Sequence, residues 1–139
     1  MTNITIALLL FYLQLLDPYH YQLMQAAPAP IDKSLPGEYL GWSMRTPRHP
    51  ANEIAIDTSK LEKWGRGPKG EWVNPRDQVV YGACTLAHEV THFRYGSGHE
   101  LPYLHEYVCL DRLGAPQWLK DSTYRRLQGA TEVIVWEQP

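Results

Sequence analysis

The chain has few cysteines, and this shortage excludes a fold held together by disulfides. Only Cys84 and Cys109 occur among the 139 residues, and they do not form a CxxC pair. We therefore expect both side chains to be reduced and buried as small apolar groups. A bridge between them, or a role as a metal ligand, is the alternative.

The chain also lacks an excess of charge of either sign. Its 13 basic and 15 acidic residues give a formal net charge of −2. A balance this close to neutral predicts no broad attraction to nucleic acid or to an anionic membrane. The basic and aromatic side chains of residues 58–78 could grip a nucleic acid or a substrate, but a solvated surface loop is the simpler reading. We expect no nucleic-acid partner.

No hydrophobic run is long enough to cross a membrane. The longest, residues 4–16, falls short of the roughly 20 residues that a transmembrane helix needs. No Lys or Arg precedes Lys33, and no small-x-small cleavage site follows the run, so a signal peptide is disfavoured. We expect a packed N-terminal helix and a cytoplasmic protein. A secreted protein, with residues 1–26 as its signal peptide, is the alternative.

The pattern of apolar residues, glycines and prolines predicts one α+β domain covering residues 1–139. It begins with a helix in residues 1–25 and a linker in residues 26–36, followed by a catalytic core in residues 37–139. In the core we expect a short mixed sheet packed against helices. The predicted strands are residues 39–44, 53–57 and 132–136, the first two joined by a turn at residues 46–50, and the predicted helices are residues 78–94, 102–113 and 116–128.

The segment with the most specific chemistry is an HExxH motif that begins at His88 and ends at His92. Residues four apart lie above one another on a helix, so the two imidazoles can bind a single Zn²⁺. Glu89 follows the first histidine, and its carboxylate can reach a water on the metal and act as general base. The motif therefore predicts one Zn²⁺ per chain and hydrolytic chemistry.

A catalytic zinc site needs a third protein ligand, and four residues after the motif could supply it. His99 lies one place beyond the position required by the pattern HExxHxxGxxH, where the chain has Gly98. Glu106 lies 14 residues beyond His92, far enough for the chain to turn back over the metal. The four candidates are His99, Glu100, His105 and Glu106.

These segments resemble the zincin superfamily of metallopeptidases, and within it the small single-domain gluzincins, or minigluzincins. The resemblance covers residues 37–114, with residues 52–57 as the strand beside the HExxH helix and residues 106–114 as the helix carrying a glutamate ligand. It implies that His88, His92 and Glu106 bind the zinc. Members often have an Asp four residues after that glutamate. Here Leu110 holds the place and Asp111 comes one residue late.

Together these features predict a zinc metallopeptidase, of the endopeptidase type, that cleaves a peptide or protein substrate. The strand at residues 53–57 could bind the substrate backbone by edge addition. The alternative is a zinc-stabilised binding or structural module without turnover, although such a module has no need of Glu89. A tyrosine could polarise the scissile carbonyl, and the candidates are Tyr95, Tyr103, Tyr107 and Tyr124.

Overall fold

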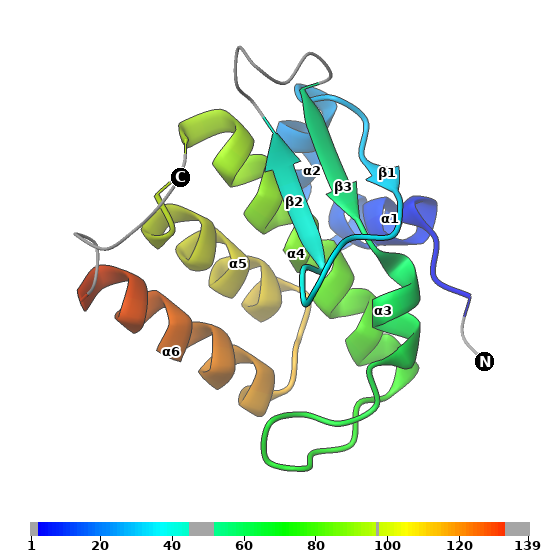
Figure 1. Ribbon diagram of the computed structural model, residues 1–139, viewed down its shortest axis with the longest axis vertical. Coiled ribbons are helices and arrows are strands. Elements are labelled where there is room, and N and C mark those ends of the chain that lie inside the picture. Colours follow the sequence, from blue (N-terminus) through cyan, green and yellow to red (C-terminus); the bar gives the residue numbers. More distant parts are fainter. Residues whose placement is uncertain (1–2, 45–51, 97, 133–139) are drawn as a thin grey trace.

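The computed structural model describes residues 3–44, 52–96 and 98–132. These residues form an α+β fold of six helices and one small mixed sheet, the class that the sequence predicts (Figure 1). The helices are α1 (Ile6–Leu16), α2 (Pro18–Gln25), α3 (Thr58–Lys63), α4 (Pro75–Tyr95), α5 (Glu100–Arg112) and α6 (Gln117–Glu132). The strands are β1 (Ile31–Asp32), β2 (Gly41–Met44) and β3 (Glu53–Ile56).

β3 is the central strand of the sheet, because the strand order is β1-β3-β2. It runs parallel to β1 and antiparallel to β2, and Ala55 is paired with Ile31 on one side and with Trp42 on the other. The strands predicted at residues 39–44 and 53–57 are confirmed with slightly shorter bounds. Among the described strands, β2 therefore forms the edge that lies next to α4.

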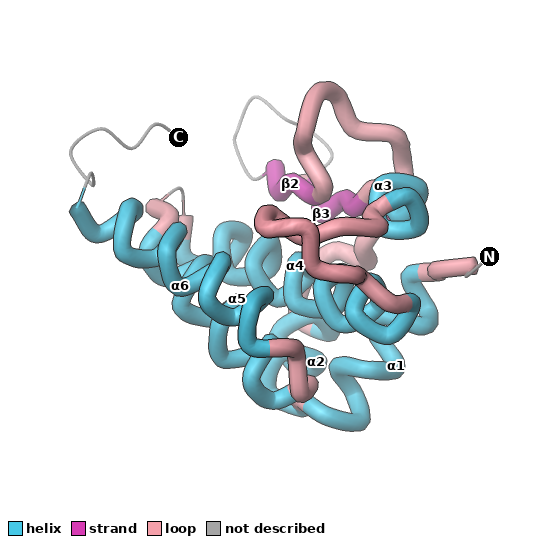
Figure 2. The backbone as a smooth tube through the Cα atoms, turned by 90° about the horizontal axis from the view of Figure 1, so that it is seen from below, coloured by secondary structure: helices cyan, strands magenta, loops and turns pink. Residues whose placement is uncertain are grey.

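α4 is the central helix and carries the HExxH motif. Its first turn is capped by the Asn74 side chain, which accepts a hydrogen bond from the Asp77 N–H at 2.8 Å. Its last turn ends at Gly96, whose φ of 104° strongly favours glycine. Every residue in positions 77–91 except Tyr81 is buried. Figure 2 shows why: the sheet lies on one side of α4, while α1 and α2 lie on the opposite side.

The three helices predicted after the sheet are confirmed. Residues 78–94, 102–113 and 116–128 correspond to α4, α5 and α6. α6 continues through Gly129, where the prediction ended it. α3 occupies the start of residues 58–78, which were predicted to be a loop throughout.

Two predicted elements fall on residues that the structure does not describe. The turn at residues 46–50 lies wholly outside the described residues. The strand predicted at residues 132–136 overlaps the described residues only at Glu132, which is the last residue of α6. Residues 133–136 lie outside the described residues.

The N-terminal region contains two helices where the sequence analysis predicted one over residues 1–25. Asp17 has non-helical backbone angles of φ −141° and ψ 68°, and it separates α1 from α2. Its carboxylate caps α2 by accepting a hydrogen bond from the His20 N–H, and Pro18 suits the first turn of a new helix. The linker predicted at residues 26–36 contributes β1 to the sheet. No helix among the described residues is both long enough and apolar enough to cross a membrane.

The expectation that both cysteines are reduced is wrong for this structure. Cys84 of α4 and Cys109 of α5 are joined by a disulfide, and both are fully buried. The two helices pack side by side with the Cα atoms 5.5 Å apart, within the range that a disulfide spans. The bond ties the helix of the HExxH motif to the helix of Glu106.

Candidate metal centre

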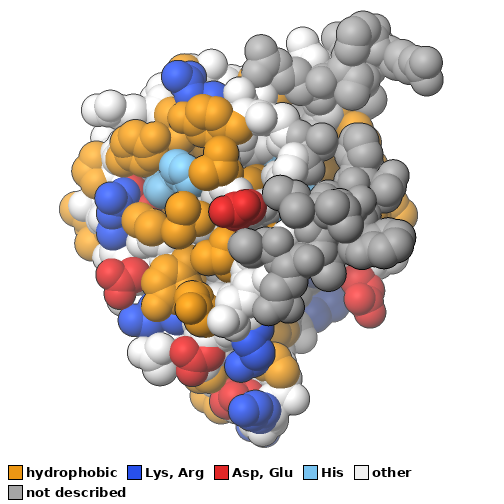
Figure 3. Space-filling view, turned by 90° about the vertical axis from the view of Figure 1, so that its left-hand side faces the viewer, with side chains coloured by type: hydrophobic (Ala, Val, Ile, Leu, Met, Phe, Trp, Pro, Cys, Tyr) orange, Lys and Arg blue, Asp and Glu red, His pale blue; other side chains and the backbone are white. Residues whose placement is uncertain are grey.

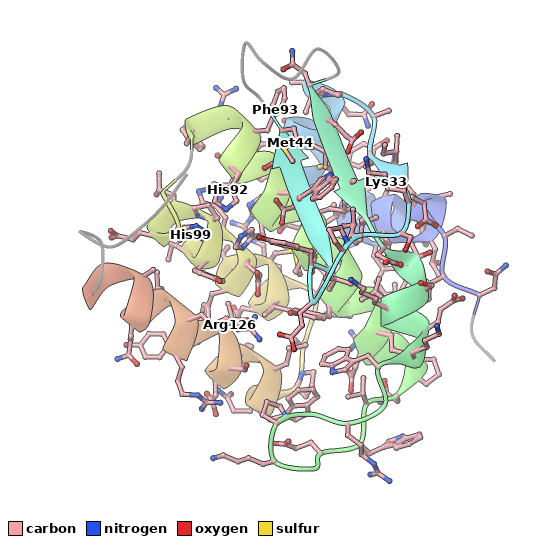
Figure 4. All side chains as sticks on the ribbon, in the orientation of Figure 1. Lys33, Met44, His92, Phe93, His99 and Arg126 are labelled. Carbon is pink, nitrogen blue, oxygen red and sulfur yellow. A yellow bond between two sulfur atoms is a disulfide. The ribbon has the colours of Figure 1, made fainter. Side chains whose placement is uncertain are left out.

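Three histidines meet where the end of α4 approaches the start of α5. A ring nitrogen of each of His88, His92 and His99 lies within 4.8 Å of the others. The ring centroids are 4.9 Å apart for His88 and His92, and 5.0 Å apart for His92 and His99. Figure 4 shows His92 and His99 next to each other. The structure thus brings the two motif histidines together with one of the candidate third ligands.

His92 is oriented by the turn that ends α4. Its Nδ1 lies 3.0 Å from the Gly96 carbonyl oxygen, which can only accept, so Nδ1 carries the hydrogen. Burial, with the neighbouring charge of His88, lowers the pKa of His92 to about 4. A neutral ring with this tautomer leaves Nε2 with a free electron pair, which is the form that binds a metal.

His88 lies deeper and faces a carboxylate. Its Nδ1 is 2.9 Å from Oε1 of Glu106, but this approach lacks hydrogen-bond geometry. Burial alone lowers the pKa of His88, but the close contact with the Glu106 carboxylate, its charge and the charge of Glu89 outweigh burial and hold the pKa above its usual value. Within the described part of the chain, His88 Nδ1 is a buried nitrogen without a hydrogen bond. An unsatisfied buried nitrogen beside other histidines fits a site that binds a metal cation.

Glu106 is oriented by side chains of α6. The Thr123 hydroxyl donates a hydrogen bond to its Oε2 at 2.8 Å, and Nη1 of Arg126 lies 3.8 Å from the same oxygen. Figure 4 shows Arg126 extending from α6, and its guanidinium also lies 3.3 Å from the hydroxyl oxygen of Tyr81. With Oε2 fixed in this way, Oε1 faces His88. The sequence analysis missed Thr123 and Arg126, which share a face of α6 three residues apart.

The other predicted contributors are placed elsewhere. Glu100 is exposed at the start of α5. His105 lies against His20, with 2.9 Å between His105 Nδ1 and His20 Nε2. Asp111 is exposed and forms an ion pair with Lys120 at 3.2 Å, so it does not orient a histidine of the centre. Of the four candidates, only His99 and Glu106 contact the motif histidines.

Glu89 is buried between α4 and the sheet. A methyl group in place of a hydrogen on Gly41 would come within 3.2 Å of Cγ of Glu89, so β2 lies directly over this side chain. Burial raises the pKa of Glu89 to about 7, although the charge of His88 and a hydrogen bond with Ser43 act in the opposite direction. A carboxyl group with a pKa near neutrality can both accept and release a proton at physiological pH.

One of the four candidate tyrosines shares the site. The ring of Tyr103 is 4.8 Å from that of His88 and 6.0 Å from that of His99. Tyr107 and Tyr124 instead contact each other, and Tyr95 packs near His105. Tyr103 is therefore the tyrosine best placed to contact a substrate bound beside the histidines.

Comparison with known proteins does not identify a family. No family model, no curated protein and no solved structure matches this chain. The functional argument therefore depends on the residues and geometry of the centre itself.

Proposed function

We propose that this protein is a zinc-dependent metallopeptidase whose active site contains His88, Glu89 and His92. The proposal is carried by one observation: the histidines of the motif converge with a third ligand candidate, while a buried carboxylate lies beside them. A bound Zn²⁺ would supply Lewis acidity, lowering the pKa of a water and polarising the scissile carbonyl. In that role the Glu89 carboxylate would act as general base and accept a proton from the attacking water.

We consider two ligand sets, and both include His88 and His92. Among the described residues, His99 is the one that offers a ligand atom within 4.8 Å of those of both motif histidines. In the set expected from the sequence, Glu106 is the third ligand, supported by its buried carboxylate 2.9 Å from His88. In the other set, His99 binds the metal and Glu106 orients His88, as carboxylates often do behind metal-bound histidines.

Zinc content after purification without chelator separates these ligand sets. We expect about one Zn²⁺ per chain in the wild type and none in the His88→Ala/His92→Ala variant. Loss of zinc in Glu106→Gln with retention in His99→Ala assigns Glu106 as the ligand, and the opposite result assigns His99. Glu100→Gln is the matched control for a carboxylate of α5 that lies outside the centre. Zinc retained by the double variant would exclude the site.

The substrate we propose is a peptide or protein chain, bound along β2. The sequence analysis assigned edge addition to the strand at residues 53–57, but this strand is β3, which already has a neighbour on each side. β2 is one of the two edge strands of the described sheet, and it is the one that lies over Glu89. An extended peptide paired with β2 would run past the histidines of α4.

The competing proposal is a zinc-stabilised module that binds without turnover. Glu89→Gln distinguishes the two, because the amide can keep the fold and the zinc but cannot take a proton. A peptidase should lose about 10²–10⁴-fold in turnover of a quenched-peptide library, measured with and without 1,10-phenanthroline. Activity that survives both the chelator and the substitution would contradict a zinc hydrolase.

The location of the protein remains a proposal as well. The sequence analysis favoured the cytoplasm, with secretion as the alternative. Disulfides are more typical of oxidising compartments, which agrees with secretion. However, residues 1–26 contribute Leu9, Leu13 and Met24 to the buried core, and this packing favours a mature protein that keeps them. Mass spectrometry of the intact protein from its native host would test it, because removal of a signal peptide would shorten the chain by about 26 residues.

A further inference from the structure

A second group of metal-ligating side chains lies where the start of α2 packs against α5. Asp17, His20 and Cys109 each offer one ligand atom, and these atoms lie within 4.8 Å of one another. All three residues are at most 1% exposed. None of them belongs to the proposed zinc centre of His88 and His92.

The side chains around this group provide polar partners and a route for an ion. His20 Nδ1 lies 2.6 Å from Oδ2 of Asp17, and Arg112 donates a hydrogen bond to Oδ1 of the same carboxylate at 2.8 Å. A hollow of about 260 Å³ reaches the group, and it is lined by Tyr19, His20, Leu104, His105, Val108 and Arg112. Figure 3 shows a face of the molecule on which hydrophobic side chains gather, with basic side chains at the margin. His20 therefore connects the buried ligands to a solvent-accessible opening.

One bond prevents these residues from acting as a site in the present structure. The sulfur of Cys109 is joined to Cys84, and a disulfide sulfur is a poor ligand because zinc binds the thiolate. We propose that reduction of the Cys84–Cys109 disulfide creates a second metal site, in which Asp17, His20 and Cys109 bind a Zn²⁺ ion. A dithiol reductant supplies two electrons and two protons and itself becomes a disulfide. The Cys109 thiol then releases its proton to solvent when the metal binds.

The chemistry of the three ligands suits zinc. Thiolate, imidazole and carboxylate are the ligand types that Zn²⁺ takes in proteins. One thiolate and one carboxylate also neutralise the charge of the ion, which matters at a position this deeply buried. Neighbouring ligand atoms around zinc are roughly 3–4 Å apart, given metal–ligand bonds of about 2.0–2.3 Å. His20 Nδ1 and Oδ2 of Asp17 are 2.6 Å apart, so a bound ion would have to replace their contact. His105, 2.9 Å from His20, is the nearest source of a fourth ligand.

A matched pair of cysteine variants tests the proposal, in a His88→Ala/His92→Ala background that removes the first centre. Cys84→Ala and Cys109→Ala both break the disulfide and both leave one thiol. Only Cys84→Ala leaves that thiol beside Asp17 and His20. Titration with Co²⁺ should give a near-ultraviolet thiolate-to-cobalt charge-transfer band, at about one equivalent, in Cys84→Ala but not in Cys109→Ala.

If Cys84→Ala fails to fold, the background protein with both cysteines is titrated before and after reduction by a dithiol and desalting, and the band should develop only after reduction. Equal bands in the two cysteine variants, or no band in the folded reduced protein, would overturn the second site. Neither result depends on peptidase activity.

Discussion

α5 contributes to two histidine clusters, and the two differ in how their buried polar atoms are satisfied. At the α1–α2 junction, Asp17, His20 and His105 form a continuous chain in which both ring nitrogens of His20 have a partner. At the end of α4, Nδ1 of His88 has a carboxylate 2.9 Å away yet makes no hydrogen bond within the described residues. In the disulfide-bonded structure the hydrogen-bonded groups of the first cluster stabilise the fold, whereas a buried nitrogen that makes no hydrogen bond calls for a functional explanation.

The buried carboxyl groups of the two regions, Asp17 and Glu89, also differ in whether their neighbours offset the effect of burial on the pKa. Burial raises the pKa of Asp17, but its bonds to His20 and Arg112 outweigh this and hold the pKa below its usual value. Burial also raises the pKa of Glu89, and there its neighbours do not compensate, so the pKa reaches about 7. The protein therefore gains stability from ionised Asp17 and loses stability when Glu89 is ionised.

The largest effect that this comparison predicts is in the N-terminal cluster. His20→Ala leaves the buried Asp17 carboxylate without its closest partner, and breaking such a pair typically costs about 3–5 kcal/mol. Urea denaturation at neutral pH measures the loss in the free energy of unfolding. His99→Ala, in the other cluster, is the control and should cost under about 1 kcal/mol in zinc-free protein. Equal losses would mean that the two clusters do not differ as proposed.

The next largest effect is that Glu89 makes the stability of the zinc-free protein depend on pH. The pKa of Glu89 is raised from 4.5 to about 7 in the folded protein. Its contribution to the free energy of unfolding is therefore fully present below pH 4.5 and is lost as the pH rises through 7. Glu89→Gln cannot ionise, so it should be more stable than the wild type by about 3 kcal/mol at pH 8, at 1.36 kcal/mol per pKa unit. At pH 4 the two proteins should unfold at similar urea concentrations. A constant difference across this range would show that the carboxyl group of Glu89 titrates normally.

The local parts of the candidate centre were predictable from sequence, because helical spacing alone determines them. His88 and His92 lie on one face of a helix whatever the rest of the chain does. The choice between His99 and Glu106 instead depends on how α5 returns after Gly96. The contribution of α6 depends on packing between helices that are distant in sequence. No local pattern determines such contacts.

The errors in the fold also have physical causes. The break at Asp17 had a local signal, since Asp followed by Pro is a typical start of a helix, but the continuous apolar run outweighed it. The central position of β3 had no local signal in the sequence. Its parallel neighbour β1 contains only two residues and lies in a segment that resembles a linker. The disulfide likewise follows from the packing of α4 on α5.

The smallest predicted effect is on zinc affinity, and it tests whether the contact of Glu106 with α6 contributes to metal binding. Thr123→Val keeps the shape of the side chain but removes the hydrogen bond to Oε2 of Glu106. Loss of such a partner behind a metal site typically weakens metal binding by about 10–100-fold, whether Glu106 binds the zinc or orients His88. Thr58→Val is the matched control, since the Thr58 hydroxyl donates to the Asp32 carboxylate at 2.6 Å, away from the centre. Competition with a zinc-binding dye measures both dissociation constants. Thr58→Val should leave zinc affinity unchanged, and an unchanged affinity in Thr123→Val would remove α6 from the metal centre.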